Sequence, residues 1–157
     1  MATPTKASIR QLELLWWLIT VLVLAAVLTP IYLKVEDYPF YLLNTVYVVG
    51  FISLARYIFF LRFTWLAESE RWKVILFFLC IPFMFYLIEG INQFQVYLDE
   101  EGPEALIKNL EGKTLSDMTT YIRSEMLLFG VGSIISAAIF PIRLLISVWR
   151  KRNRNSV

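Results

Sequence analysis

A glutamate and two amides stand together inside one of the most apolar stretches of the chain. Glu89, Asn92 and Gln93 are three and four positions apart, so a helix places all three on one face. A carboxyl group within a membrane is unfavourable unless it is hydrogen-bonded, protonated or reached by water. This face therefore suits hydrogen-bonded helix packing, passage of ions or protons, binding of a cationic ligand, or exposure near the membrane surface.

A fourth polar residue, Asn44, is the expected partner of this face. Lys73 directly precedes the apolar stretch that carries Glu89 and so marks one membrane boundary. Counting ~1.5 Å per residue from Lys73 places Glu89 roughly 24 Å from this boundary, in the far third of the membrane. Asn44, near the outer end of the second apolar stretch, lies at a better level to hydrogen-bond Glu89. By the same rise, Arg56 lies only about 9 Å from the boundary at Lys73. Its depth therefore differs too much from that of Glu89 for the two side chains to pair. We expect Asn44 to hydrogen-bond Glu89.

Two arginines lie within apolar stretches, each near the end of the stretch that adjoins a basic segment. Arg56 and Arg143 have side chains long enough to reach lipid headgroups while their stems stay in hydrocarbon. We expect both to contact headgroups. The alternatives are binding of an anionic lipid, or pairing with an acid on a partner subunit.

Small residues recur at helical spacing in the last apolar stretch. Gly132 with Ser136, and Ser133 with Ala137, are four positions apart, a pattern that lets a neighbouring backbone come close. We expect helix packing here, with a neighbour in the same chain or in another copy. The serines have no evident base to activate them, which argues against intramembrane hydrolysis.

The residue inventory excludes several chemistries. The chain has no histidine, so it offers no His-ligated haem, no His-containing zinc site and no histidine base. Its one cysteine, Cys80, forms neither an intramolecular disulfide nor a thiolate cluster. The sequence Gly112-Lys113-Thr114 lacks the earlier glycine of a phosphate-binding loop. We expect no cofactor, no metal and no catalytic residue.

The elements that carry these residues are four long apolar stretches. The chain has 157 residues, 58% of them hydrophobic and 18% charged, with the charges confined to short segments. A spanning helix needs ~20 mostly apolar residues. Residues 14–33, 40–61, 74–98 and 126–149 meet that length. The prediction is one transmembrane domain over residues 1–157.

The connections between these stretches predict the topology. A short turn joins the first two, which makes them antiparallel neighbours. The segment 99–125 is the longest connection, and within it 103–110 has the pattern of a short amphipathic helix with Leu106, Ile107 and Leu110 on one side. The predicted fold is an all-α membrane protein, an antiparallel four-helix transmembrane bundle with a short extracytoplasmic amphipathic helix between spans three and four.

Charge and tryptophan placement predict the orientation. Segment 99–125 holds seven acids against three bases, whereas the tail 150–157 has four bases and no acid. Because lysine and arginine favour cytoplasmic loops, both termini are expected to be cytoplasmic. The tryptophans agree, since all lie at cytoplasmic span ends or in the cytoplasmic loop: Trp16, Trp17, Trp65, Trp72 and Trp149. The expected location is the cell inner membrane.

Function is predicted mainly by elimination. The leading hypothesis is a non-catalytic accessory or scaffold subunit of a larger membrane complex, or a self-assembling bundle. The alternative is a small oligomeric ion or proton channel or transporter unit that uses the polar face around Glu89, and the third is a lipid-modifying enzyme. The expected partners are membrane lipids and other membrane subunits or further copies. Nucleic acid is not expected, because the only basic cluster is a short tail beside the membrane.

Overall fold

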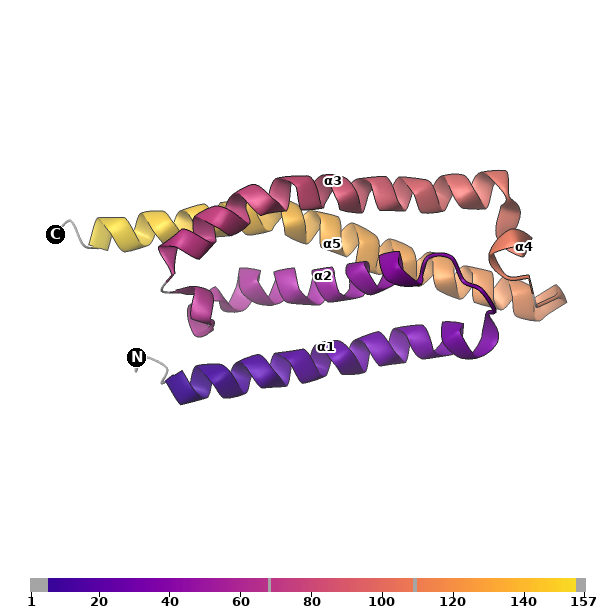
Figure 1. Ribbon diagram of the computed structural model, residues 1–157, viewed down its shortest axis with the longest axis horizontal. Coiled ribbons are helices and arrows are strands. Elements are labelled where there is room, and N and C mark those ends of the chain that lie inside the picture. The colour runs from indigo at the N-terminus through magenta and orange to yellow at the C-terminus, as the bar shows by residue number, and fades with distance from the viewer. Residues whose placement is uncertain (1–5, 68, 109, 155–157) are drawn as a thin grey trace.

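The chain is all-helical in the residues that the computed structural model describes, which are 6–67, 69–108 and 110–154 (Figure 1). This confirms the all-helical part of the predicted fold class. In chain order the elements are α1 (Lys6–Lys34), α2 (Tyr41–Phe60), the 3-10 turns η1 (Leu61–Phe63) and η2 (Trp65–Ala67), α3 (Glu70–Glu100), α4 (Gly102–Leu106) and α5 (Gly112–Arg154).

Four helices, α1, α2, α3 and α5, are long and apolar enough to cross a membrane, as the sequence predicts. A helix satisfies its own backbone hydrogen bonds, which hydrocarbon requires of any spanning segment. Three of these helices, α1, α3 and α5, are longer than their apolar stretches, since α1 already begins at Lys6 and α5 at Gly112. With 43 residues, α5 is about 65 Å long, roughly twice the thickness of the hydrocarbon.

The long helices lie side by side and alternate in direction (Figure 1). Helix α5 packs against both α2 and α3, and α1 packs mainly against α2. The start of α1 and the end of α5 lie at the same end of the molecule, here called the terminal end. The opposite end carries α4 and the α1–α2 connection, and is called the α4 end.

Large apolar side chains cover the outside of these helices. In the most apolar part of α1 only 11% of the residues are buried, and Leu22, Phe59 and Ile142 are among the exposed side chains. A soluble protein rarely exposes so continuous an apolar surface, whereas acyl chains solvate it well. The exposed surface is therefore that of a multi-pass membrane protein.

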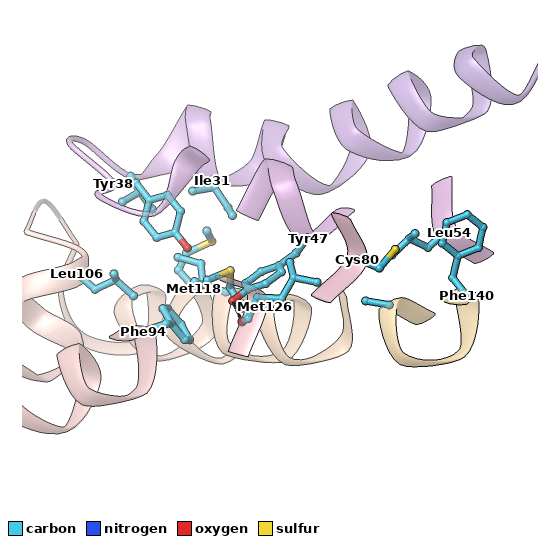
Figure 2. Close-up of a cluster of buried hydrophobic side chains, with 14 of the residues drawn as sticks. Ile31, Tyr38, Tyr47, Leu54, Cys80, Phe94, Leu106, Met118, Met126 and Phe140 are labelled. Carbon is cyan, nitrogen blue, oxygen red and sulfur yellow. Dashed lines mark hydrogen bonds between the residues drawn. The ribbon is translucent and has the colours of Figure 1, made fainter. Parts of the chain in front are cut away.

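The interior holds one apolar cluster that extends along the molecule (Figure 2). Leu54, Cys80 and Phe140 pack towards the terminal end, and Phe94 and Leu106 lie at the other side of the view. An apolar side chain is solvated about equally well by the protein interior and by acyl chains. Apolar packing therefore favours one arrangement of the helices over another only weakly. The polar contacts between helices therefore carry much of the specificity.

The short helix between α3 and α5 differs from its prediction. The sequence indicates a helix over 103–110, but α4 ends at Leu106, and the next helix, α5, begins at Gly112. Leu106 and Ile107 are each 1% exposed, so they cover the α4 end. Gly102 has a φ of +79°, a conformation that glycine adopts readily, which turns the chain out of α3.

Small residues let α5 approach its neighbours within the same chain. Ser133, Ser136 and Ala137 are buried. Ser133 donates a hydrogen bond to the backbone oxygen of Tyr47 at 2.7 Å. A Cβ added at Gly132 would lie 2.8 Å from the Phe51 ring. The patch of small residues predicted for helix packing thus faces α2.

We predict that Gly90→Ala destabilises the protein by about 1 to 3 kcal/mol, because the added methyl overpacks a filled site. Its Cβ would lie 2.4 Å from Leu43 Cδ1 and 2.7 Å from the Tyr47 hydroxyl. That hydroxyl is held by a hydrogen bond to Leu87 O at 2.8 Å, so it yields poorly. The measurement is the free energy of unfolding in detergent micelles.

Gly50→Ala is the matched control for this prediction. Its added Cβ meets its nearest atoms, in Phe83 and Ser133, at 3.5 Å, an ordinary contact. Since alanine favours helix over glycine, this variant should be neutral or slightly more stable. Equal losses in the two variants would contradict the close approach at Gly90.

Candidate intramembrane polar site

A buried carboxyl and a buried amide pair between α2 and α5 near the α4 end. Asn44 is fully buried in the first turn of α2, and Glu125 is 6% exposed on α5. The Asn44 side-chain nitrogen donates a hydrogen bond to Glu125 Oε1. This pair joins two helices whose partners are 81 residues apart in sequence, so it fixes the register of α2 against α5.

Tyr38 extends this pair from the α1–α2 connection. Its side chain is 4% exposed, and its hydroxyl points into the core (Figure 2). Burial raises the pKa of the Tyr38 phenol well above its usual range, and the nearby Glu125 carboxylate raises it further. Tyr38 is therefore a neutral hydrogen-bond donor. We call Tyr38, Asn44 and Glu125 the α4-end polar cluster.

The cluster presents one donor and two acceptors to its centre. Tyr38 Oη, Asn44 Oδ1 and Glu125 Oε2 are enclosed, and none has a hydrogen-bond partner among the described residues. A hydroxyl can donate and the two oxygens can accept, so the three groups are complementary in hydrogen bonding. None of the three side chains is an activated nucleophile, so the arrangement suits binding and positioning more than covalent chemistry.

This cluster differs from the site predicted around Glu89. The sequence indicates that Asn44 bonds Glu89, but the structure turns Asn44 to Glu125 instead. Glu89, Asn92 and Gln93 do share one face of α3, and that face is exposed. Gln93 Nε2 donates to Glu89 Oε1 at 3.3 Å. The prediction compared the depths of Asn44 and Glu89 across the membrane. Depth alone does not determine the direction in which a side chain points.

Glu125 was missed because it stands at the border of the last apolar stretch. It was counted among the acids of the segment 99–125, yet α5 already begins at Gly112 and continues through Glu125 into the last apolar stretch. Met118, Ile122 and Met126 are buried on the same helix and place Glu125 on its core-facing side. Extending the helical periodicity backwards from 126 would have revealed it.

A second polar contact joins α1 to α2 towards the terminal end. Arg56 is 5% exposed and its Nη2 lies 2.5 Å from Glu13 Oε2. The Arg56 guanidinium also lies 5.2 Å from the centre of the Tyr57 ring. The predicted contact of Arg56 with headgroups or a partner subunit is therefore wrong. The reason is that α1 begins early enough to bring Glu13 to the height of Arg56.

Arg143 on α5 occupies a different environment. It is half-buried, and its Nε donates to the Ile58 backbone oxygen at 3.0 Å. That bond uses one of the five donors of a guanidinium. A headgroup contact for the rest of the side chain stays a prediction.

Metal binding finds no support in the described residues. Within the described ranges, no three histidine, cysteine, aspartate or glutamate side chains gather closely enough to hold an ion. Cys80 is a free thiol buried among apolar residues. The polar cluster remains the strongest candidate for a binding site inside the molecule.

We predict that Glu13→Leu lowers the free energy of unfolding by about 3 kcal/mol, because it leaves the Arg56 charge buried and unpaired. Glu70→Leu is the control, since Glu70 lies 3.4 Å from Lys151 and 3.9 Å from Arg152 in a more exposed setting. That variant should lose about 1 kcal/mol or less. Unfolding in micelles measures both, and similar losses would contradict a buried pair at Arg56.

A double-mutant cycle tests the buried pair of Asn44 and Glu125. Asn44→Leu should destabilise by about 2 kcal/mol, because it leaves a buried carboxyl without its donor. Combined with Glu125→Met, the loss should be smaller than the sum of the single losses by about 1 kcal/mol or more. The exposed pair Gln93→Leu and Glu89→Met is the control and should show coupling close to zero.

Additive losses at Asn44 and Glu125 would mean that the two side chains do not interact.

Comparison with known proteins identifies no relative: no protein-family model, curated protein or solved structure matches this chain.

Proposed function

We propose that this chain is a non-catalytic subunit of a membrane assembly, and that the outer face of α3 contacts a neighbouring membrane helix. The observation that carries the proposal is the exposure of Glu89, Asn92 and Gln93 on that face. They sit within a helix that is long and apolar enough to span a membrane.

The depth of these side chains makes lipid a poor neighbour for them. Glu89 is ten residues before Asp99, which corresponds to about 15 Å along the helix. Intramembrane carboxyl groups almost always face protein or water, because hydrocarbon does not solvate them. The bond from Gln93 satisfies one oxygen of Glu89 and leaves the group on the surface. A partner helix with polar side chains would solvate it better.

The surrounding surface suits such a partner. Phe85, Tyr86, Ile88 and Val96 are exposed on the same helix around the polar residues. Aromatic and branched side chains around a few polar groups resemble the centre of a protein interface. Since a carboxyl accepts and an amide both donates and accepts, the face can pair with a second copy as well as with another subunit.

We further propose that the molecule is an antiparallel bundle of four spanning helices, with its terminal end in the cytoplasm. Arg150, Lys151 and Arg152 lie at the terminal end, whereas Asp99, Glu100 and Glu101 lie at the α4 end. The positive-inside tendency favours this orientation. A bacterial type of inner membrane fits the compact connections.

An ion path lined by Glu89 stands as the alternative. In one chain the polar face is on the outside, so a path would require several copies that turn α3 inwards. Buried polar groups such as Arg56, Asn44 and Ser133 are bound within the chain, which favours a structural role. A ring of identical copies, together with altered flux after Glu89→Gln in vesicles, would favour the channel over the scaffold.

The test places a photo-crosslinking amino acid at position 92 on the α3 face, in native membranes. We expect covalent adducts with protein at this position. Position 128 on α5 is the control, because Leu128 is 65% exposed and lies two residues before Gly130, which approaches Ile91 of α3. It should form adducts with lipid. Protein adducts absent from position 92, with lipid adducts at both positions, would refute the proposal.

Glu89→Leu makes the same test quantitative. If Glu89 bonds a partner, its loss should reduce the protein adduct at position 92 on the order of tenfold, the effect of one or two hydrogen bonds between membrane helices. Leucine is better solvated by lipid, so the isolated chain should keep its stability. An undiminished adduct would show that the contact does not involve Glu89.

A further inference from the structure

A pocket of about 370 Å³ opens at the α4 end between α3 and α5. Asp99 and Gln95 line it from α3, and Thr119 and Arg123 line it from α5. Phe94 and Leu127 form its apolar part. None of these residues belongs to the α4-end polar cluster, and none is part of the polar face around Glu89.

The pocket combines opposite charges that do not neutralise one another. Asp99 and Arg123 are both exposed, and in the described part of the chain no ion pair joins them. Each charge therefore stays available to a ligand. A ligand that carries a phosphate and an ammonium group would complement both, because arginine binds phosphate well and a carboxylate accepts from ammonium.

A threonine hydroxyl adds a neutral hydrogen-bonding group. Thr20, Thr45 and Thr120 each donate to the backbone oxygen four residues earlier, at 2.8 to 2.9 Å. Thr119 Oγ1 is enclosed and makes no hydrogen bond among the described residues. Because Thr119 lines the pocket, rotation about its χ1 would turn this hydroxyl towards a phosphate or ester oxygen there.

The place of the pocket along the helices suits a lipid. Asp99 directly follows the apolar stretch of α3, where headgroups meet hydrocarbon. From Leu127, exposed residues Val131 and Ile135 continue at four-residue steps along one face of α5. A headgroup in the pocket would place its acyl chains on this apolar face.

We propose that this pocket binds a zwitterionic phospholipid with a primary amine headgroup of the phosphoethanolamine type. Arg123 contacts the phosphate, and Asp99 accepts hydrogen bonds from the ammonium group. A quaternary ammonium has no N–H to donate, so a choline headgroup loses the contact with Asp99. Because the pocket holds one charge of each sign, a headgroup of net charge zero fits better than an anionic one.

The test measures lipid binding to the purified full-length chain by native mass spectrometry. Phosphatidylethanolamine, phosphatidylcholine and phosphatidylglycerol with identical acyl chains are compared. We expect the ethanolamine lipid to bind about tenfold more strongly than the choline lipid, the effect of one charge-assisted hydrogen bond. Equal binding of the two would overturn the proposal.

Two variants separate the roles of the charges. Arg123→Gln should weaken binding of all three lipids, and Asp99→Asn should abolish the preference for ethanolamine over choline. Lys113→Gln and Asp117→Asn are the controls, because both residues are exposed on α5 outside the pocket and change charge equally. Identical effects of Arg123→Gln and Lys113→Gln would refute the assigned site.

Free phosphoethanolamine distinguishes a lipid from a soluble ligand. If the apolar face of α5 holds the acyl chains, a large excess of the soluble compound should fail to displace the lipid. Full displacement at concentrations equal to that of the lipid would overturn the assignment of a lipid.

Discussion

Hydrocarbon solvates an apolar side chain about as well as a protein core does, and this constraint explains which contacts matter here. Burial of leucine or phenylalanine gives spanning helices little reason to choose one neighbour over another. Close backbone approach and hydrogen bonds make the choice instead. Ser133 donates to the backbone of Tyr47, and the Tyr47 hydroxyl donates to Leu87, so one tyrosine of α2 ties together α5 and α3.

The charged contacts extend the same principle towards the two ends of the molecule. Glu13 and Arg56 hold α1 to α2, and Asn44 and Glu125 hold α2 to α5. A displacement of one helix by a single turn would leave a buried charge or amide without its partner, which is far more unfavourable than an imperfect apolar contact. The polar pairs thus specify register, even where they add little net stability.

Sequence patterns predicted the elements better than the contacts between them. Four apolar stretches of spanning length are visible directly, because their length is set by membrane thickness. The partners of Arg56 and Asn44 were not predicted, since both acids lie just outside the apolar stretches, at Glu13 and Glu125. Helices α1 and α5 continue beyond the ends of their apolar stretches. Identifying the apolar stretches alone therefore misses the polar residues that these helices bury just outside them.

Two glutamates in this chain show how the direction of a side chain decides its role. Glu125 projects into the molecule, where Asn44 donates to it, and there it works as an internal structural contact. Glu89 is on the exposed face of α3, where Gln93 of the same helix donates a hydrogen bond to it. The carboxyl group of Glu125 thus stabilises the fold, whereas the carboxyl group of Glu89 is poorly solvated if lipid surrounds it. In the proposed assembly a neighbouring protein helix would offer Glu89 hydrogen bonds, which acyl chains do not.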